Sequence, residues 1–196
     1  MSDGHQAGAC MRVTREQAAA NRERVLDAAS TLFRKHGFDG VGVADIMKAA
    51  GLTHGGFYGQ FASKEDLAAE ACAHSRTDPW AAWLDAPPDQ RLAGIVRNYL
   101  TPRHRDNRTT GCLFAALGSD VGRQPRSVRR AFTERVRAKI DLLRGVVPGR
   151  SAAARRDTAM ATLAGLVGAL ILARAVDDPA LSDEILEAAA TTFERS

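Results

Sequence analysis

Apolar residues recur along this chain at spacings of three and four, the period of an amphipathic α-helix. The clearest stripe consists of Val128, Phe132, Val136, Ile140 and Leu143. The full pattern predicts helices over residues 15–36, 43–50, 54–60, 64–76, 90–100, 112–121, 127–146, 152–176 and 180–193. No segment alternates apolar and polar residues as a half-buried strand would. We therefore expect an all-α protein of nine helices.

Capping and stop residues in the sequence also predict where helices begin and end. Gly37 is placed to stop the first helix, and two capping boxes, Thr14 with Gln17 and Ser63 with Asp66, are placed to start the first and fourth. We divide the chain into a disordered arm (1–11), a three-helix head (12–62) and a six-helix body (63–196).

Residues 37–61 carry the strongest functional signal. A short amphipathic run ends at Gly51, and a second short element starts near Thr53. Two short helices joined by a three- to four-residue turn with glycine form a helix-turn-helix, whose second helix can enter the major groove of DNA. The alternative is that residues 51–59 are a flexible glycine-rich loop.

Candidate DNA-contacting groups lie at the start of each short element. Glycines let a backbone approach bases and phosphates closely, and free N–H groups at a helix start can hold a phosphate. Hydroxyl, imidazole and ammonium groups suit phosphate and base contacts. The predicted residues are Gly42, Val43, Thr53, His54, Gly55, Gly56, Tyr58, Gly59 and Lys64.

The charge distribution does not itself identify a DNA-binding surface. The 196 residues carry a net charge of +4. Residues 91–160 contain 16 Lys and Arg against 5 Asp and Glu, whereas residues 1–64 contain 8 against 6. The basic excess therefore lies outside the helix-turn-helix, and the DNA-binding prediction rests on the motif.

The head resembles the TetR family of bacterial transcriptional regulators. The matching segments read VLDAA from Val25, VADI from Val43, AAGL from Ala49, FY at Phe57 and SKEDL from Ser63. Gly42 departs from the Thr or Ser common in the family. The resemblance implies a homodimer that binds a palindromic operator in double-stranded DNA, usually as a repressor released by a small-molecule effector.

The last two predicted helices resemble the dimerisation helices of that family. Helix 152–176 is apolar nearly all round and rich in small residues, so it must be buried on most sides. The predicted interface residues are Leu163, Gly165, Leu166, Gly168, Leu170, Ile185 and Phe193. The alternative is that this pair forms only the core of its own chain.

By the same resemblance, the central helices enclose an effector pocket. The candidate lining residues are Trp80, Trp83, Tyr99, Cys112, Phe114 and Phe132, and each has plain core packing as its alternative. An arginine-rich segment, containing Arg97, Arg103, Arg105 and Arg108, raises the option of an acidic effector. Its alternative is a solvated basic face.

Cys112 is a candidate redox sensor. It follows Gly111 at a predicted helix start, and helix N-termini and nearby arginines favour the reactive thiolate. The alternative is an inert buried cysteine. Cys72 and Cys10 are weaker candidates.

The remaining sequence narrows the function classes. The three cysteines show no metal-ligand or disulfide spacing, which favours a reducing cytoplasm and predicts neither metal nor cofactor. The uncharged run 158–173 spans roughly 24 Å, too short for the membrane core. No catalytic motif is present, so we expect no enzyme. The competing function is a dimeric helical module that binds protein without specific DNA binding.

Overall fold

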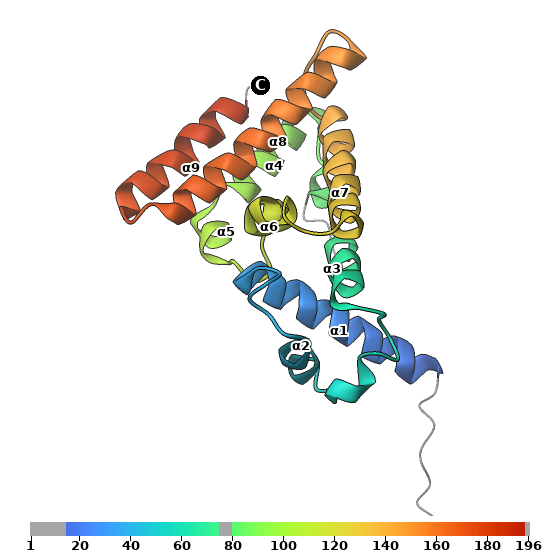
Figure 1. The fold of residues 1–196 in the computed structure, drawn as a ribbon. Coiled ribbons are helices and arrows are strands. Elements are labelled where there is room, and N and C mark those ends of the chain that lie inside the picture. Colours follow the sequence, from blue (N-terminus) through green and yellow to red (C-terminus); the bar gives the residue numbers. More distant parts are fainter. Residues whose placement is uncertain (1–14, 75–79, 195–196) are drawn as a thin grey trace, which may run out of the picture.

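The computed structural model describes residues 15–74 and 80–194, and all regular elements in these residues are helical (Figure 1). The nine α-helices are α1 (Arg15–His36), α2 (Val43–Ala49), α3 (Lys64–Ala73), α4 (Pro88–Tyr99), α5 (Pro102–Asp106), α6 (Leu113–Val121), α7 (Arg126–Arg144), α8 (Ala152–Ala175) and α9 (Pro179–Phe193). Two 3₁₀ turns, η1 (His54–Gly56) and η2 (Ala81–Trp83), accompany them. The prediction of an all-α fold is confirmed for the described residues. The predicted arm 1–11 and the cap at Thr14 lie outside them.

Two elements differ from the sequence prediction. The helix expected over residues 54–60 is only the single turn η1 followed by bends. Each helical glycine costs about 1 kcal/mol relative to alanine, and Gly55, Gly56 and Gly59 all fall in this segment. Conversely, α5 forms between residues 100 and 112, where the pattern predicted no helix, because Thr101 accepts a hydrogen bond from the His104 N–H (3.1 Å) and Pro102 starts the helix.

The head is organised around α1, whose buried face carries Val25, Leu26, Ala29 and Phe33. The helix stops at Gly37, whose φ of +73° is a left-handed conformation that side chains disfavour. The fourth predicted helix, α3, starts as expected, since the Ser63 hydroxyl accepts a hydrogen bond from the Asp66 N–H (3.1 Å).

Head and body share a hydrophobic core. The cluster around α1, α2 and α3 also contains Leu113, Leu117 and Val121 from α6 and Val128 from α7. Figure 1 shows α6 lying between α1 and the pair formed by α8 and α9. The boundary near residue 62 stays a prediction, and the two parts that it divides are joined through this core.

The body is built on α8, which packs against both α7 and α9. The Phe193 ring lies over Gly165, where an added Cβ would come within 2.0 Å of it. The Ser151 hydroxyl caps α8 by accepting from the Ala154 N–H (3.0 Å), and the Asp178 carboxylate caps α9. These contacts fix α8 and α9 as a tight antiparallel pair.

By length and composition alone, α8 is apolar enough to cross a membrane, and it is the one such helix found in residues 15–74 and 80–194. The core helix of a soluble protein meets the same criterion. Its buried residues include Leu163, Leu166 and Leu170, which pack in the second hydrophobic cluster of the chain. We therefore describe α8 as a core helix with one exposed face.

Candidate functional site

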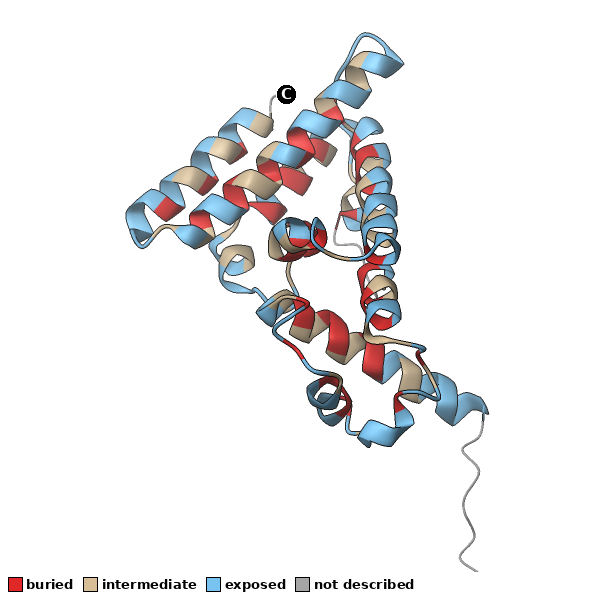
Figure 2. Ribbon diagram, viewed as in Figure 1, coloured by how far each residue is buried: buried red, intermediate tan, exposed pale blue. Residues whose placement is uncertain are grey.

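Residues 53–59, which we call the 53–59 turn, project from the head on a buried aromatic anchor. Phe57 is fully buried and stacks on Phe61, with 5.6 Å between the ring centroids. The next residue, Tyr58, is 69% exposed and meets Phe57 edge-on at 5.1 Å. Thr53 and His54 are also exposed, and Figure 2 shows the outer side of α2 and the turn facing solvent. Three polar side chains are thus presented on one firmly anchored turn.

Neither the backbone conformation nor the packing of the described residues requires a glycine at Gly55. Its φ is not positive, and an added Cβ would meet no atom within 4 Å. Cβ atoms at Gly56 and Gly59 would meet only ordinary contacts, at 3.7 Å and 3.8 Å. The missing side chains leave a smooth exposed backbone that another molecule can approach closely.

The start of α2 offers less than predicted. The Gly42 N–H donates a hydrogen bond to the Asp45 carboxylate (3.3 Å), so this group is not free to hold a phosphate. The expectation of a free N–H at Gly42 is therefore wrong for this structure. Val43 is half-buried, and Lys64, the first residue of α3, is also half-buried. The exposed candidates are concentrated in the 53–59 turn.

Ionic contacts join α1 to α3 beside the aromatic anchor. The Arg22 guanidinium of α1 binds the Glu70 carboxylate of α3 (2.6 Å) and lies 4.6 Å from the centroid of the Phe61 ring. Farther along, His74 bonds to the Asp27 carboxylate (2.8 Å). α1, α3 and the aromatic anchor therefore form one connected unit.

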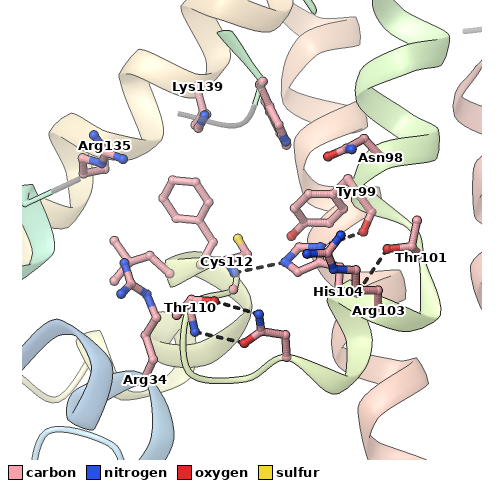
Figure 3. Close-up of a pocket in the computed structure, with 15 residues that line it drawn as sticks. Arg34, Asn98, Tyr99, Thr101, Arg103, His104, Thr110, Cys112, Arg135 and Lys139 are labelled. Atoms are coloured by element: carbon pink, nitrogen blue, oxygen red, sulfur yellow. Dashed lines mark hydrogen bonds between the residues drawn. The ribbon is translucent and has the colours of Figure 1, made fainter. Parts of the chain in front are cut away.

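A cavity of about 490 Å³ lies where α1 meets the body (Figure 3). This volume is in the range of small-molecule sites. Its described lining comprises Arg34, Trp80, Asn98, Tyr99, Thr101, Arg103, His104, Asn107, Thr110, Gly111, Cys112, Leu113, Phe114, Arg135 and Lys139.

Four of the six predicted pocket residues line this cavity, namely Trp80, Tyr99, Cys112 and Phe114. Two do not, and their predicted place in the lining is wrong. The Trp83 ring packs on Gly94, where an added Cβ would lie 2.1 Å from it. Phe132 lies behind Phe114, which it meets edge-on at 5.4 Å. Both are packing residues.

The positive side chains of the cavity were mostly missed from sequence. Arg34 comes from α1, and Arg135 and Lys139 come from α7. The arginine-rich segment was only a partial guide: Arg103 lines the cavity, whereas Arg97 pairs with Glu194 and Arg105 pairs with Asp183. A stripe of cations on α7 carries no sequence signal that separates cavity from surface.

His104 ties the cavity wall together in a defined tautomer. Its Nδ1–H donates to the Tyr99 carbonyl (2.7 Å), and its Nε2 accepts from the Cys112 N–H (3.1 Å). Burial lowers the pKa of His104, and nearby Arg174 lowers it further, against a raising contribution from the Tyr99 carbonyl. Neutral imidazole therefore links α4 and α5 to the start of α6.

The two described cysteines differ in environment. Cys72 is buried, and burial raises its pKa to about 11, which disfavours the thiolate. Cys112 is only half-buried, occupies the N-cap of α6 and faces the cavity. Cys112 is thus the more accessible candidate for thiol chemistry.

The exposed face of α8 differs from the predicted dimer interface. Leu163, Leu166 and Leu170 are buried in their own chain, so their prediction as interface residues is corrected. The exposed side, which we call the α8 face, consists of Ala161, Ala164, Gly168, Ile171, Leu172 and Ala175, with Gly168 half-exposed. Leu172 is 57% exposed, and an added Cβ at Gly168 would meet no atom within 4 Å. Ile185 and Phe193 are half-buried on α9.

Metal chemistry has no candidate site in the described part of the chain. No group of three or more His, Cys, Asp and Glu side chains there could hold a metal ion. The candidate functional features of the described residues are the exposed 53–59 turn and the cationic cavity.

Comparison with known proteins gives these features a family. Residues 25–71 match the family described as "Bacterial regulatory proteins, tetR family". The HTH-type transcriptional regulator AcrR of Shigella flexneri is 39% identical over 59 residues, covering 30% of this chain and 27% of that protein. The HTH-type transcriptional repressor NemR of Escherichia coli K12 is 26% identical over 128 residues, covering 62% of this chain and 64% of NemR. The chain thus spans less than two thirds of either relative.

Solved structures share the fold over most of their length. The reduced form of E. coli NemR has a TM-score of 0.71 at 22% identity, covering 88% of this chain and 94% of NemR. A TetR-family regulator from Cytophaga hutchinsonii has a TM-score of 0.74 at 18% identity, covering 90% and 94%. The matched segment contains α2, the 53–59 turn and its aromatic anchor. Residues 25–71 therefore carry the matched segment of the TetR family of bacterial regulatory proteins, and the chain as a whole shares the fold of the solved structures.

Proposed function

We propose that this protein is a cytoplasmic, sequence-specific DNA-binding transcriptional regulator that binds a palindromic operator as a homodimer. It acts as a repressor, released when a small molecule occupies the cavity. The observation that carries the proposal is the exposed 53–59 turn, which lies in the segment that matches the family. The turn presents polar side chains, and the packing of the chain does not require the glycine at Gly55.

Different residues of the 53–59 turn contact the phosphates and the bases of the DNA. Tyr58 is the most exposed aromatic residue of the turn, so its hydroxyl can contact a phosphate, and Lys64 adds a positive charge at the start of α3. Thr53 and His54 reach base edges, where hydroxyl and imidazole groups can discriminate sequence. Gly55, Gly56 and Gly59 let the turn sit deep in the groove.

The α8 face supplies the partner surface. It is an apolar strip along a 24-residue helix, and small residues at Ala164 and Gly168 permit close approach of a second helix. A two-fold dimer buries the same strip twice, and its symmetry matches that of a palindrome.

The cavity supplies the regulatory input. Its wall contains Arg34 from α1, so an occupant touches the same helix that supports the 53–59 turn. A ligand shifts DNA affinity only if it binds the DNA-competent and released forms with different affinity. Contact with both α1 and α7 offers a direct route to that difference.

Gly55→Ala is expected to weaken operator binding at least about tenfold. The free energy of unfolding should stay equal or rise by about 0.4–1 kcal/mol, because Ala fits the backbone and restricts the unfolded chain. The added methyl group would push the turn away from the DNA. Fluorescence anisotropy with an operator selected from bound genomic fragments measures the affinity, and urea unfolding measures stability.

The matched control is Gly118→Ala, at an exposed position of α6 where an added Cβ makes only a 3.9 Å contact. It should stabilise α6 by about 0.8–1 kcal/mol and leave DNA affinity unchanged. Unchanged operator affinity in Gly55→Ala would contradict the proposed contact. Failure of the wild-type protein to retain any DNA at low salt, where phosphate contacts are strongest, would favour the protein-binding alternative.

A thiol-reactive effector is the second form of release, and it acts at Cys112. In a Cys10→Ser background, N-ethylmaleimide should release the operator. The Cys112 thiolate adds to the maleimide double bond, a proton from water completes the addition, and the resulting adduct fills the cavity. Cys112→Ser should abolish this release, whereas Cys72→Ser should retain it, since the Cys72 thiol is buried. Equal release from the Cys112→Ser protein, measured by anisotropy, would remove Cys112 as the sensor.

A further inference from the structure

The cavity wall is rich in cationic side chains. Its described lining includes Arg34, Arg103, Arg135 and Lys139, and contains no Asp or Glu. The cations come from three separate helical regions, so local sequence does not force them together. Bringing the Arg34 and Arg135 guanidiniums together in a partly buried site is unfavourable, which makes an anion the natural occupant.

The Arg34 guanidinium shows why this grouping of cations is unfavourable. Its Nη1 donates to the Ser30 hydroxyl (2.6 Å) and to the Ser30 carbonyl (3.2 Å), and neither acceptor is charged. Burial lowers the pKa of Arg34, and the neighbouring Arg135 guanidinium lowers it further, while the two cysteines Cys112 and Cys72 act in the opposite direction. The two guanidiniums therefore lie within electrostatic reach of one another. In Figure 3 they extend from the same side of the cavity.

Three buried polar atoms of the lining have no hydrogen-bond partner among the described residues. They are Nε of Arg34, Nε of Arg135 and the hydroxyl of Tyr99, a residue that is only 4% exposed. Both guanidinium nitrogens are donors, and the phenol can donate as well. A buried donor without an acceptor is unfavourable, because it has lost its hydrogen bonds to water. Three such donors around one cavity indicate a ligand rich in acceptor oxygens.

The apolar part of the cavity defines the rest of the ligand. Trp80 and Phe114 line it together with the face of Tyr99, and the Trp80 and Tyr99 centroids are 5.5 Å apart. A volume of about 490 Å³ exceeds what an inorganic anion needs. Aromatic walls favour a flat apolar group.

We propose that the cavity binds a small organic anion with an aromatic or similar apolar group, whose charged oxygens lie between Arg34 and Arg135 while the apolar group packs against Trp80 and Phe114. This inference rests on the proposed function, because it names the chemical class of the effector. The anion joins α1 to α7 through the two guanidiniums, so the head and the body are tied at the helix that carries the 53–59 turn.

The test compares matched probes on the full-length protein without DNA. 2-Naphthoate should bind with a dissociation constant on the order of 1 mM or tighter, detected by calorimetry and by quenching of Trp80 fluorescence. Its uncharged isostere, 2-naphthamide, and inorganic sulfate should each bind at least about tenfold more weakly. Equal binding of naphthoate and naphthamide, sulfate binding as tight as that of naphthoate, or no saturable naphthoate binding would overturn the proposal.

Substitutions locate the charged end. Arg34→Gln and Arg135→Gln should each weaken naphthoate binding about 10- to 100-fold, and Arg34→Lys, which keeps the charge, should weaken it less. Arg137→Gln is the matched control, because Arg137 is exposed on α7 and pairs with Glu134 (2.8 Å). Wild-type affinity in both glutamine variants, with folding checked by circular dichroism, would refute the site. Since no DNA is present, failure here is distinct from failure of the proposed operator binding.

Discussion

Ala164→Glu is expected to convert the dimer into a monomer and to reduce operator affinity roughly 100- to 1,000-fold at nanomolar protein. Ala164 is an exposed residue of the α8 face near the middle of α8, one turn before the open position at Gly168. In a two-fold dimer the substitution places two carboxylates in one apolar interface, and each unpaired buried charge costs about 3–5 kcal/mol. Sedimentation equilibrium measures the mass, and fluorescence anisotropy measures DNA binding.

The control for this variant is Ala138→Glu, which puts the same charge on an exposed position of another long helix, α7. It should remain dimeric with wild-type DNA affinity. A dimeric Ala164→Glu protein would show that the chain uses a different surface to associate, and the half-exposed residues Ile185 and Phe193 of α9 would then be substituted next.

Phe57→Ala is expected to lower the free energy of unfolding by about 3–5 kcal/mol and to eliminate measurable operator binding. Phe57 is fully buried, stacks on Phe61 and supports the edge of Tyr58. Removing the ring leaves a cavity below the 53–59 turn, which has only one 3₁₀ turn of its own to keep its shape. Urea unfolding followed by circular dichroism gives the stability, and anisotropy gives the DNA affinity.

The neighbouring residue separates stability from DNA contact. Tyr58→Ala removes a side chain that is 69% exposed, so stability should change by less than about 0.5 kcal/mol. Operator affinity should nevertheless fall, because the phosphate-contacting hydroxyl is lost. Near-wild-type DNA binding by Phe57→Ala, or no loss of binding in Tyr58→Ala, would contradict the division into buried anchor and exposed contact.

The sequence was a good guide wherever local rules decide structure. The apolar period located the long helices α1, α7, α8 and α9 within a few residues, and the cap at Ser63 formed as expected. It was a poor guide for residues 54–60, where the pattern predicted a helix. The low helix propensity of the glycines there leaves a single 3₁₀ turn, followed by the buried Phe57 ring.

The predicted lining of the cavity was also only partly correct. Trp80, Tyr99, Cys112 and Phe114 were expected in the lining from the family resemblance, and they line the cavity. Trp83 and Phe132 have the same residue chemistry but pack against Gly94 and Phe114. Which aromatic residue faces the cavity depends on helix rotation, and spacing alone does not fix rotation.

By itself, the sequence determined the long helices and the identity of the groups that the glycine-rich turn can present. These properties follow from period, capping and propensity, which act over a few residues. Only the tertiary structure decided that Arg34 and Arg135 line the same cavity, and that Ala164 and Gly168, with Leu166 turned inward, form the open side of α8. Those outcomes depend on packing between helices about a hundred residues apart in the chain, where each face is assigned by its neighbours.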